Sequence, residues 1–208
     1  ASLQKGPGGF VRDSRRLLNI RSFATLLVGM VFIQFSFGCI MPVLPLYLQQ
    51  LAGGAEIISL AGLVFALRGL TSASASIFAG KWSSRYGAKK TMICALLGTG
   101  VFLVAQGSAT DVTSLAVVTV VGGVSFGAIR PLANVMIAEI VPADDRGKAF
   151  GITTSASAFG FAAGPVVGAY VGADHGFPAA FYLTSLLFVA TAAWVWWSLE
   201  SRSASSVE

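Results

Sequence analysis

The sequence GKWSSRYGAKK at residues 80–90 forms a short basic turn between two long apolar runs, residues 57–79 and 91–109. A run of about 20 apolar residues is long enough to cross the hydrocarbon core of a bilayer as a helix. The turn carries the four cations Lys81, Arg85, Lys89 and Lys90. Because Lys and Arg beside membrane helices are retained on the cytoplasmic side, this turn predicts in which direction the chain threads the membrane.

The composition is typical of a membrane protein. Of 208 residues, 55% are hydrophobic and only 11% are charged, and the mean hydropathy is +0.76, which is unlike a water-soluble globular domain. We therefore predict an all-α membrane protein with a leader at residues 1–21, a six-helix transmembrane bundle at residues 22–198 and a tail at residues 199–208. The leader is either an amphipathic cytoplasmic linker or disordered. The six predicted spans are residues 22–50, 57–79, 91–109, 114–140, 149–172 and 178–198.

Charged residues divide between alternate connections of these spans. Apart from Arg68 and Arg130, every Lys and Arg falls on one side of the predicted membrane. The other side holds Glu56, Asp111, Asp174 and His175. This asymmetry predicts that both termini are cytoplasmic. The net charge of +5 then reflects contact with anionic lipid headgroups, and we do not interpret it as nucleic-acid binding.

The basic turn resembles the loop between the second and third helices of each half of a major facilitator superfamily transporter, written G-x-x-x-D-R-x-G-R-K. The positions that match are Gly80, Arg85, Gly87 and Lys89. Ser84 replaces the Asp of the motif and Ala88 its second Arg, as in the copy of the loop in a C-terminal half. The alternative is a generic basic cytoplasmic loop.

The turn at residues 142–151 resembles the loop between the fourth and fifth helices of the same family. That resemblance implies a cytoplasmic latch in which Glu139 and Arg146 join Arg85 of the first turn. Without an Asp at Ser84, the latch lacks one carboxylate. Three independently solvated charges are the alternative, since exposed ion pairs contribute little. The predicted gating loop consists of Gly80, Arg85, Gly87, Lys89, Glu139 and Arg146.

The fifth span has a glycine at every fourth position, which indicates close contact with another helix. Its stripe consists of Gly160, Gly164, Gly168 and Gly172, with Pro165 among them. Residues 160–169 resemble the antiporter motif g-x-x-x-G-P-x-x-G-G, with Ala169 in the last glycine position. In the family this helix lies at the interface between halves, so the resemblance implies that the glycine-lined flank is left for a partner unit.

Among the polar side chains within the predicted spans, four are candidates for a substrate site: Gln34, Arg68, Arg130 and Asn134. A guanidinium near the bilayer centre costs about 3 kcal/mol or more unless it faces a partner or water. We predict that the two arginines lie at similar depths and that all four side chains line a substrate cavity. Alternatives remain open: Gln34 forms an interhelical hydrogen bond, and Arg68 forms a structural ion pair or bonds to backbone carbonyls.

The pentapeptide at residues 123–127 has the form G-x-S-x-G, the nucleophile elbow of serine hydrolases. That elbow requires a strand-to-helix turn and a neighbouring base. The one histidine of the chain, His175, is predicted in an outer loop, far from Ser125. We therefore predict helix packing here, and assign no catalytic residue, cofactor or metal site.

Taken together, the resemblance implies one half, the C-terminal six-helix half, of a major facilitator transporter in the bacterial inner membrane. It implies a proton-coupled exporter of small amphipathic molecules or drugs, working by alternating access through a cavity lined by the first, second, fourth and fifth helices. A second six-helix unit, from the same parent chain or a partner subunit, is then required. Phenylalanines suit lipophilic substrates, whereas Arg68 or Arg130 favours an anion. The alternative is a non-transporting six-helix scaffold.

Overall fold

The computed structural model describes residues 16–53 and 57–200, and within these residues the chain is helical and without strands. Six helices of this part are long and apolar enough to cross a membrane, which confirms the all-α prediction. They are α2 (Arg21–Ala52), α3 (Ile57–Tyr86), α4 (Ala88–Gly107), α5 (Val112–Ile140), α6 (Arg146–His175) and α7 (Phe177–Glu200), with a short 3-10 turn, η1 (Ala143–Asp145), before α6. Predictions for the start of the leader, Glu56 and the end of the tail lie outside the described residues.

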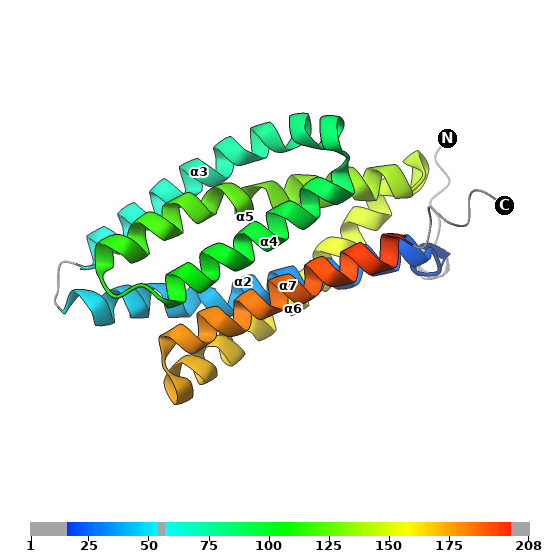
Figure 1. Ribbon diagram of the computed structural model, residues 1–208. Helices are drawn as coiled ribbons and strands as arrows, with labels where there is room; N and C mark the ends of the chain where they lie inside the picture. The colour runs from blue at the N-terminus through cyan, green and yellow to red at the C-terminus, as the bar shows by residue number, and fades with distance from the viewer. Residues whose placement is uncertain (1–15, 54–56, 201–208) are drawn as a thin grey trace.

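The helices run back and forth between two ends of the bundle (Figure 1). The start of α2, the α3–α4 turn, the α5–α6 turn and the end of α7 lie at one end. That end carries Arg21, Lys81, Arg85, Lys89, Lys90, Arg146 and Lys148. The opposite end carries Asp111, Asp174 and His175. The charge asymmetry read from the sequence is therefore an asymmetry of the folded bundle; its orientation in the cell stays a prediction.

Two turns show how the chain reverses within very few residues. Gly87 alone separates α3 from α4, and its φ of 87° lies in a region that residues with a Cβ rarely adopt. At the other end, the Asp111 carboxylate accepts a hydrogen bond of 2.9 Å from the Ser114 N–H and caps α5. Hydrogen bonds from Ser114 lower the pKa of Asp111 below its ordinary value, because they stabilise the ionised carboxylate.

Helices α3 and α5 are joined by hydroxyl groups that donate to backbone carbonyls. Ser72 Oγ lies 3.0 Å from the carbonyl oxygen of Gly123, and Ser76 Oγ lies 2.9 Å from that of Gly127. Pro131 has no N–H, so the carbonyl of Gly127, four residues earlier, lacks its usual partner within α5. Ser76 satisfies that carbonyl from the neighbouring helix, as a low-dielectric environment requires.

The G-x-S-x-G pentapeptide lies inside α5 and packs on both sides. A Cβ built at Gly127 would overlap the backbone of Ser72 on α3, and one built at Gly123 would overlap Thr71 and the Arg68 carbonyl. Ser125 faces the opposite neighbour, α4, where a Cβ built at Gly98 would lie 2.7 Å from its Oγ. The pentapeptide therefore brings α3, α4 and α5 close together. It lies within a helix, whereas a nucleophile elbow requires a strand-to-helix turn.

The glycine stripe of α6 packs against α2 of the same chain. Cβ atoms at Gly160, Gly164 and Gly168 would collide with the carbonyl oxygens of Val31, Phe35 and Cys39, respectively. All three glycines are buried. The expectation that this flank is left for a partner unit is wrong, because it is already filled by the backbone of α2. The large apolar side chains that α6 exposes most are Phe159, Val166 and Tyr170.

Candidate functional site

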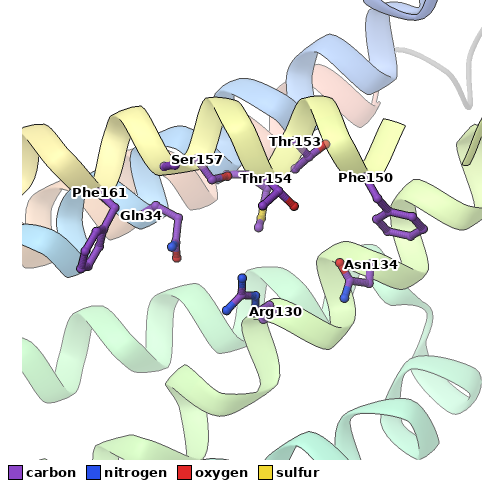
Figure 2. A pocket seen from close by; sticks show the side chains of 10 residues that line it. Gln34, Arg130, Asn134, Phe150, Thr153, Thr154, Ser157 and Phe161 are labelled. Carbon is purple, nitrogen blue, oxygen red and sulfur yellow. The ribbon is translucent and has the colours of Figure 1, made fainter. Parts of the chain in front are cut away.

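A pocket of about 230 Å³ lies between α2, α5 and α6. It brings together three of the four predicted cavity residues: Gln34 from α2 and Arg130 and Asn134 from α5. In Figure 2 the guanidinium group of Arg130 and the amide of Gln34 point toward one another across this space. The three side chains are far apart in sequence, so the fold alone assembles them into one site. We call this space the Arg130 pocket.

The opposite wall of the Arg130 pocket comes from α6, the fifth predicted span, whose individual lining residues the sequence-based prediction did not name. It consists of Phe150, Thr153, Thr154, Ser157, Ala158 and Phe161 (Figure 2). These positions recur every three or four residues and so form one face of the helix. The signal was present in the run TTSAS at residues 153–157, a polar segment inside an otherwise apolar span.

The polar groups of this pocket have few partners within the protein. Ser157 is only 7% exposed, yet its Oγ forms no hydrogen bond with the described residues. Gln34, Arg130 and Asn134 likewise make no hydrogen bond or ion pair within the described part of the chain. The interhelical hydrogen bond considered for Gln34 is therefore not formed there. Buried polar atoms are normally satisfied, so an unpaired one beside an open pocket needs an explanation.

Arg68 lies in a second pocket, of about 220 Å³, bordered by α2, α3 and α5. Its guanidinium carbon is 5.1 Å from the ring centre of Phe126 and 5.8 Å from that of Phe37. Both distances are within the range of cation–π attraction. Arg68 therefore contacts aromatic faces, and neither alternative considered for it, an ion pair or carbonyl bonding, is formed with the described residues.

A row of stacked rings separates the two arginines. Phe37 stacks on Phe126, with ring centres 4.9 Å apart, and on Phe161, at 6.0 Å. Phe126 borders the Arg68 pocket and Phe161 borders the Arg130 pocket. The stack thus connects α5, α2 and α6 across the middle of the bundle, with one arginine on each side.

The prediction that the arginines lie at similar depths is wrong. Hydrogen bonds between α3 and α5 join residues 51 apart in sequence, as for Ser72 and Gly123. In this register Arg130 lies level with position 79 of α3, which is 11 residues beyond Arg68. At 1.5 Å per residue the separation along the axis is about 16 Å. Close packing at Gly123 and Gly127 sets this register, and hydropathy carries no information about it.

At the basic end, Arg146 caps the preceding helix. It donates hydrogen bonds to the carbonyl oxygens of Ala138, at 2.7 Å, and Val141, at 3.3 Å. Arg85 lies over the ring of its neighbour Tyr86, and Lys89 lies over Trp196 at 5.5 Å. Within the described residues no ion pair joins Arg85, Glu139 and Arg146. The latch stays a prediction, and the bonds of Arg146 show a structural role for that residue.

The described residues contain no cluster of His, Cys, Asp and Glu that could hold a metal ion. The chemistry that the site offers is recognition by charge, hydrogen bonds and aromatic surface. Such a set of groups can hold and orient a small molecule.

Comparison with known proteins identifies the fold. The chain is 30% identical over 171 residues to the multidrug resistance protein MdtG of Yersinia enterocolitica, covering 81% of the chain and 41% of that protein. It is 27% identical over 179 residues to MdtG of Serratia proteamaculans, with 86% and 44% covered. The crystal structure of the human organic anion transporter MFSD10 (TETRAN) superposes with a TM-score of 0.73 at 22% identity, covering 84% of this chain and 40% of the other.

The chain therefore spans less than half the length of these relatives. The sequence model that describes the Major Facilitator Superfamily matches residues 26–208, which is most of the chain. The proteins of this family are transporters, which excludes the intramembrane hydrolase suggested by the G-x-S-x-G pentapeptide. The chain belongs to the major facilitator superfamily.

Proposed function

We propose that the chain is one half of a secondary active transporter that exports small amphipathic organic molecules by alternating access. The observation that carries this proposal is the Arg130 pocket, an open polar site between three helices that are each long and apolar enough to cross a membrane. Polar and charged groups within a membrane bundle are costly and usually mark a substrate or ion pathway. Relatives named multidrug resistance proteins support an organic substrate and export.

A second six-helix unit completes the transporter in this proposal, supplied by the same parent chain or by a partner subunit. Helix α3 packs mainly against α5 and leaves much of its apolar surface uncovered. The most exposed large aliphatic side chains of α3 are Leu63, Leu70 and Ile77. Helix α6 similarly exposes Phe159, Val166 and Tyr170. Lipid covers part of this surface, and we propose that the second unit covers the part that borders the two pockets.

The pairing of helices within the bundle supports a moving cavity. Helix α2 packs most closely on α6 and α3 on α5, whereas these two pairs make few contacts with each other. The Arg130 pocket and the Arg68 pocket both lie where the pairs meet. Small rotations of one pair against the other would therefore change access to Gln34, Arg130 and Asn134 more than the packing within either pair.

Export is proposed to be coupled to protons, with the titrating carboxylate on the second unit. The nine acidic residues of this chain all lie outside the middle of the spans. A proton-coupled cycle requires a group that changes charge within the membrane. By the positive-inside rule, the basic end with Lys81, Arg85 and Lys90 is cytoplasmic, as are both termini, in a bacterial inner membrane.

The test is flux through the complete transporter, reconstituted in proteoliposomes. Under an imposed proton gradient we expect efflux of an amphipathic fluorescent dye, reduced at least tenfold by Arg130→Ala. Lys90→Gln, an exposed cation outside both pockets, is the matched control and should retain the flux. Absence of dye flux, with the two six-helix units still associated, would favour the scaffold over the transporter.

A further inference from the structure

We infer that the Arg130 pocket binds the anionic head group of an amphipathic substrate, such as a carboxylate, sulfonate or phosphonate. This inference rests on the proposed transport function and adds the charge of the substrate. Three features of the pocket carry it: its charge, its unpaired hydrogen-bond donors and its size.

The charge of the pocket is positive and uncompensated. Arg130 is the only charged side chain among the residues that line it. The nearest acidic residue along α5 is Glu139, nine positions on, or about 13 Å along the helix axis. A guanidinium at membrane depth requires a counter-charge or water. An anionic ligand supplies that counter-charge, whereas a cation would be repelled.

The hydrogen-bonding groups are arranged for an acceptor. Ser157 offers a buried hydroxyl without a partner in the described part of the chain, and Asn134 and Gln34 offer amide N–H groups. Figure 2 shows these groups around Arg130, on three different helices. Oxygens of a carboxylate, sulfonate or phosphonate accept bonds from all of them, and charge-assisted bonds are about twice as strong as neutral ones.

The part of the pocket formed by this six-helix unit has the size of a head group. At about 230 Å³ it is smaller than the roughly 300–1,000 Å³ typical of sites for whole drug-sized ligands. It therefore accommodates a head group, and the rest of the molecule extends along the neighbouring surface. Phe161 borders the pocket and continues through its stack with Phe37. These rings offer an apolar face to an aromatic or aliphatic body.

The experiment compares two probes that share one aromatic skeleton, 8-anilinonaphthalene-1-sulfonate and the uncharged N-phenyl-1-naphthylamine. Binding of each is measured by fluorescence with the complete transporter in lipid nanodiscs, after subtraction of empty nanodiscs. We expect the sulfonate to bind at least tenfold more tightly than the neutral probe. Arg130→Gln should weaken binding of the sulfonate at least tenfold, and Ser157→Ala should weaken it about threefold. In both variants the dissociation constant of the neutral probe should change less than twofold.

Lys90→Gln removes the same charge at an exposed position in the first turn of α4 and controls for surface potential. It should leave both dissociation constants unchanged. Retained binding of the neutral probe by Arg130→Gln shows that the variant is folded. Equal binding of the two probes by the unmodified protein would overturn the inference. If Arg130→Gln weakens binding of both probes equally, the inference is also overturned. It is likewise overturned if Arg130→Gln weakens binding of neither probe, the result expected when a carboxylate of the second unit neutralises Arg130.

These outcomes are distinct from failure of the proposed function. Selective sulfonate binding without proton-dependent flux would contradict the transport proposal and retain the anion site. Proton-dependent flux of the amphipathic dye, together with equal binding of the two probes, would retain transport and contradict the anion site.

Discussion

Gly164 of α6 lies directly against the carbonyl oxygen of Phe35 on α2, and its other neighbour is the backbone of Gly38. No side chain fits between these two helices at that level. Phe35 and Gly38 lie on either side of Phe37, whose ring is part of the stack between the two pockets. The glycine contact therefore fixes the distance at which α2 and α6 present Gln34 and Ser157 to the Arg130 pocket.

Gly164→Ala should destabilise the bundle, because the added methyl group must push α2 and α6 apart. Overpacking of a tight core contact costs about 1–3 kcal/mol. We expect a lower Tm in nanodiscs and weaker ligand binding. Gly151→Ala is the matched control, since position 151 of α6 has open space around it and Ala favours a helix by roughly 0.5–1 kcal/mol over Gly. Equal Tm values for the two variants would contradict the packing described for Gly164.

A double-mutant cycle between Arg68 and Phe126 should reveal a favourable coupling. The guanidinium lies 5.1 Å from the ring centre, and a desolvated cation–π contact contributes about 0.5–2 kcal/mol. The cycle uses Arg68→Met and Phe126→Leu, with the free energy of unfolding as the measured quantity. Phe65→Leu is the control, because Phe65 lines the same pocket without a ring contact to Arg68 among the described residues. A coupling no larger than that with Phe65 would show that Arg68 is held by something else.

The sequence predicted the spans because hydrophobic length is a property of each segment by itself. Five of the six predicted spans lie within the observed helices; the third, 91–109, runs two residues past α4. The G-x-S-x-G pentapeptide could also be interpreted correctly. Its glycines imply close packing whatever the neighbour, and the required base was missing.

The sequence could not specify which surfaces meet. The stripe at Gly160, Gly164 and Gly168 predicted a close contact, but periodicity does not say whether the neighbour is α2 or another unit. The relative depth of Arg68 and Arg130 depends on the register of α3 against α5, which Gly123 and Gly127 set through packing. Residues Gln34, Arg130 and Asn134 were found because polar groups stand out in apolar spans. Ser157 was missed because small hydroxyl residues usually serve helix packing.

Arg146→Gln should destabilise the α5–α6 turn even without any gating effect. The side chain bonds to two carbonyls at the end of α5, those of Ala138 and Val141. Helix C-termini leave such carbonyls unpaired, and an exposed bond of this kind contributes about 1 kcal/mol. We expect a small decrease in Tm, with Lys90→Gln as the control for charge. A Tm identical to that of the unmodified protein, together with reduced flux, would indicate a latch and not a cap.

The proposed threading predicts that His175 and Lys90 lie on opposite faces of the membrane. His175→Cys and Lys90→Cys are prepared separately in a transporter whose other cysteines, Cys39 and Cys94 among them, are replaced by Ala. A membrane-impermeant maleimide should label the His175→Cys variant in intact spheroplasts and the Lys90→Cys variant only after permeabilisation. The reason is that α4, α5 and α6, three spans, separate the two positions. Labelling of both variants from the same side would contradict the transmembrane arrangement, and the transport proposal would fail with it.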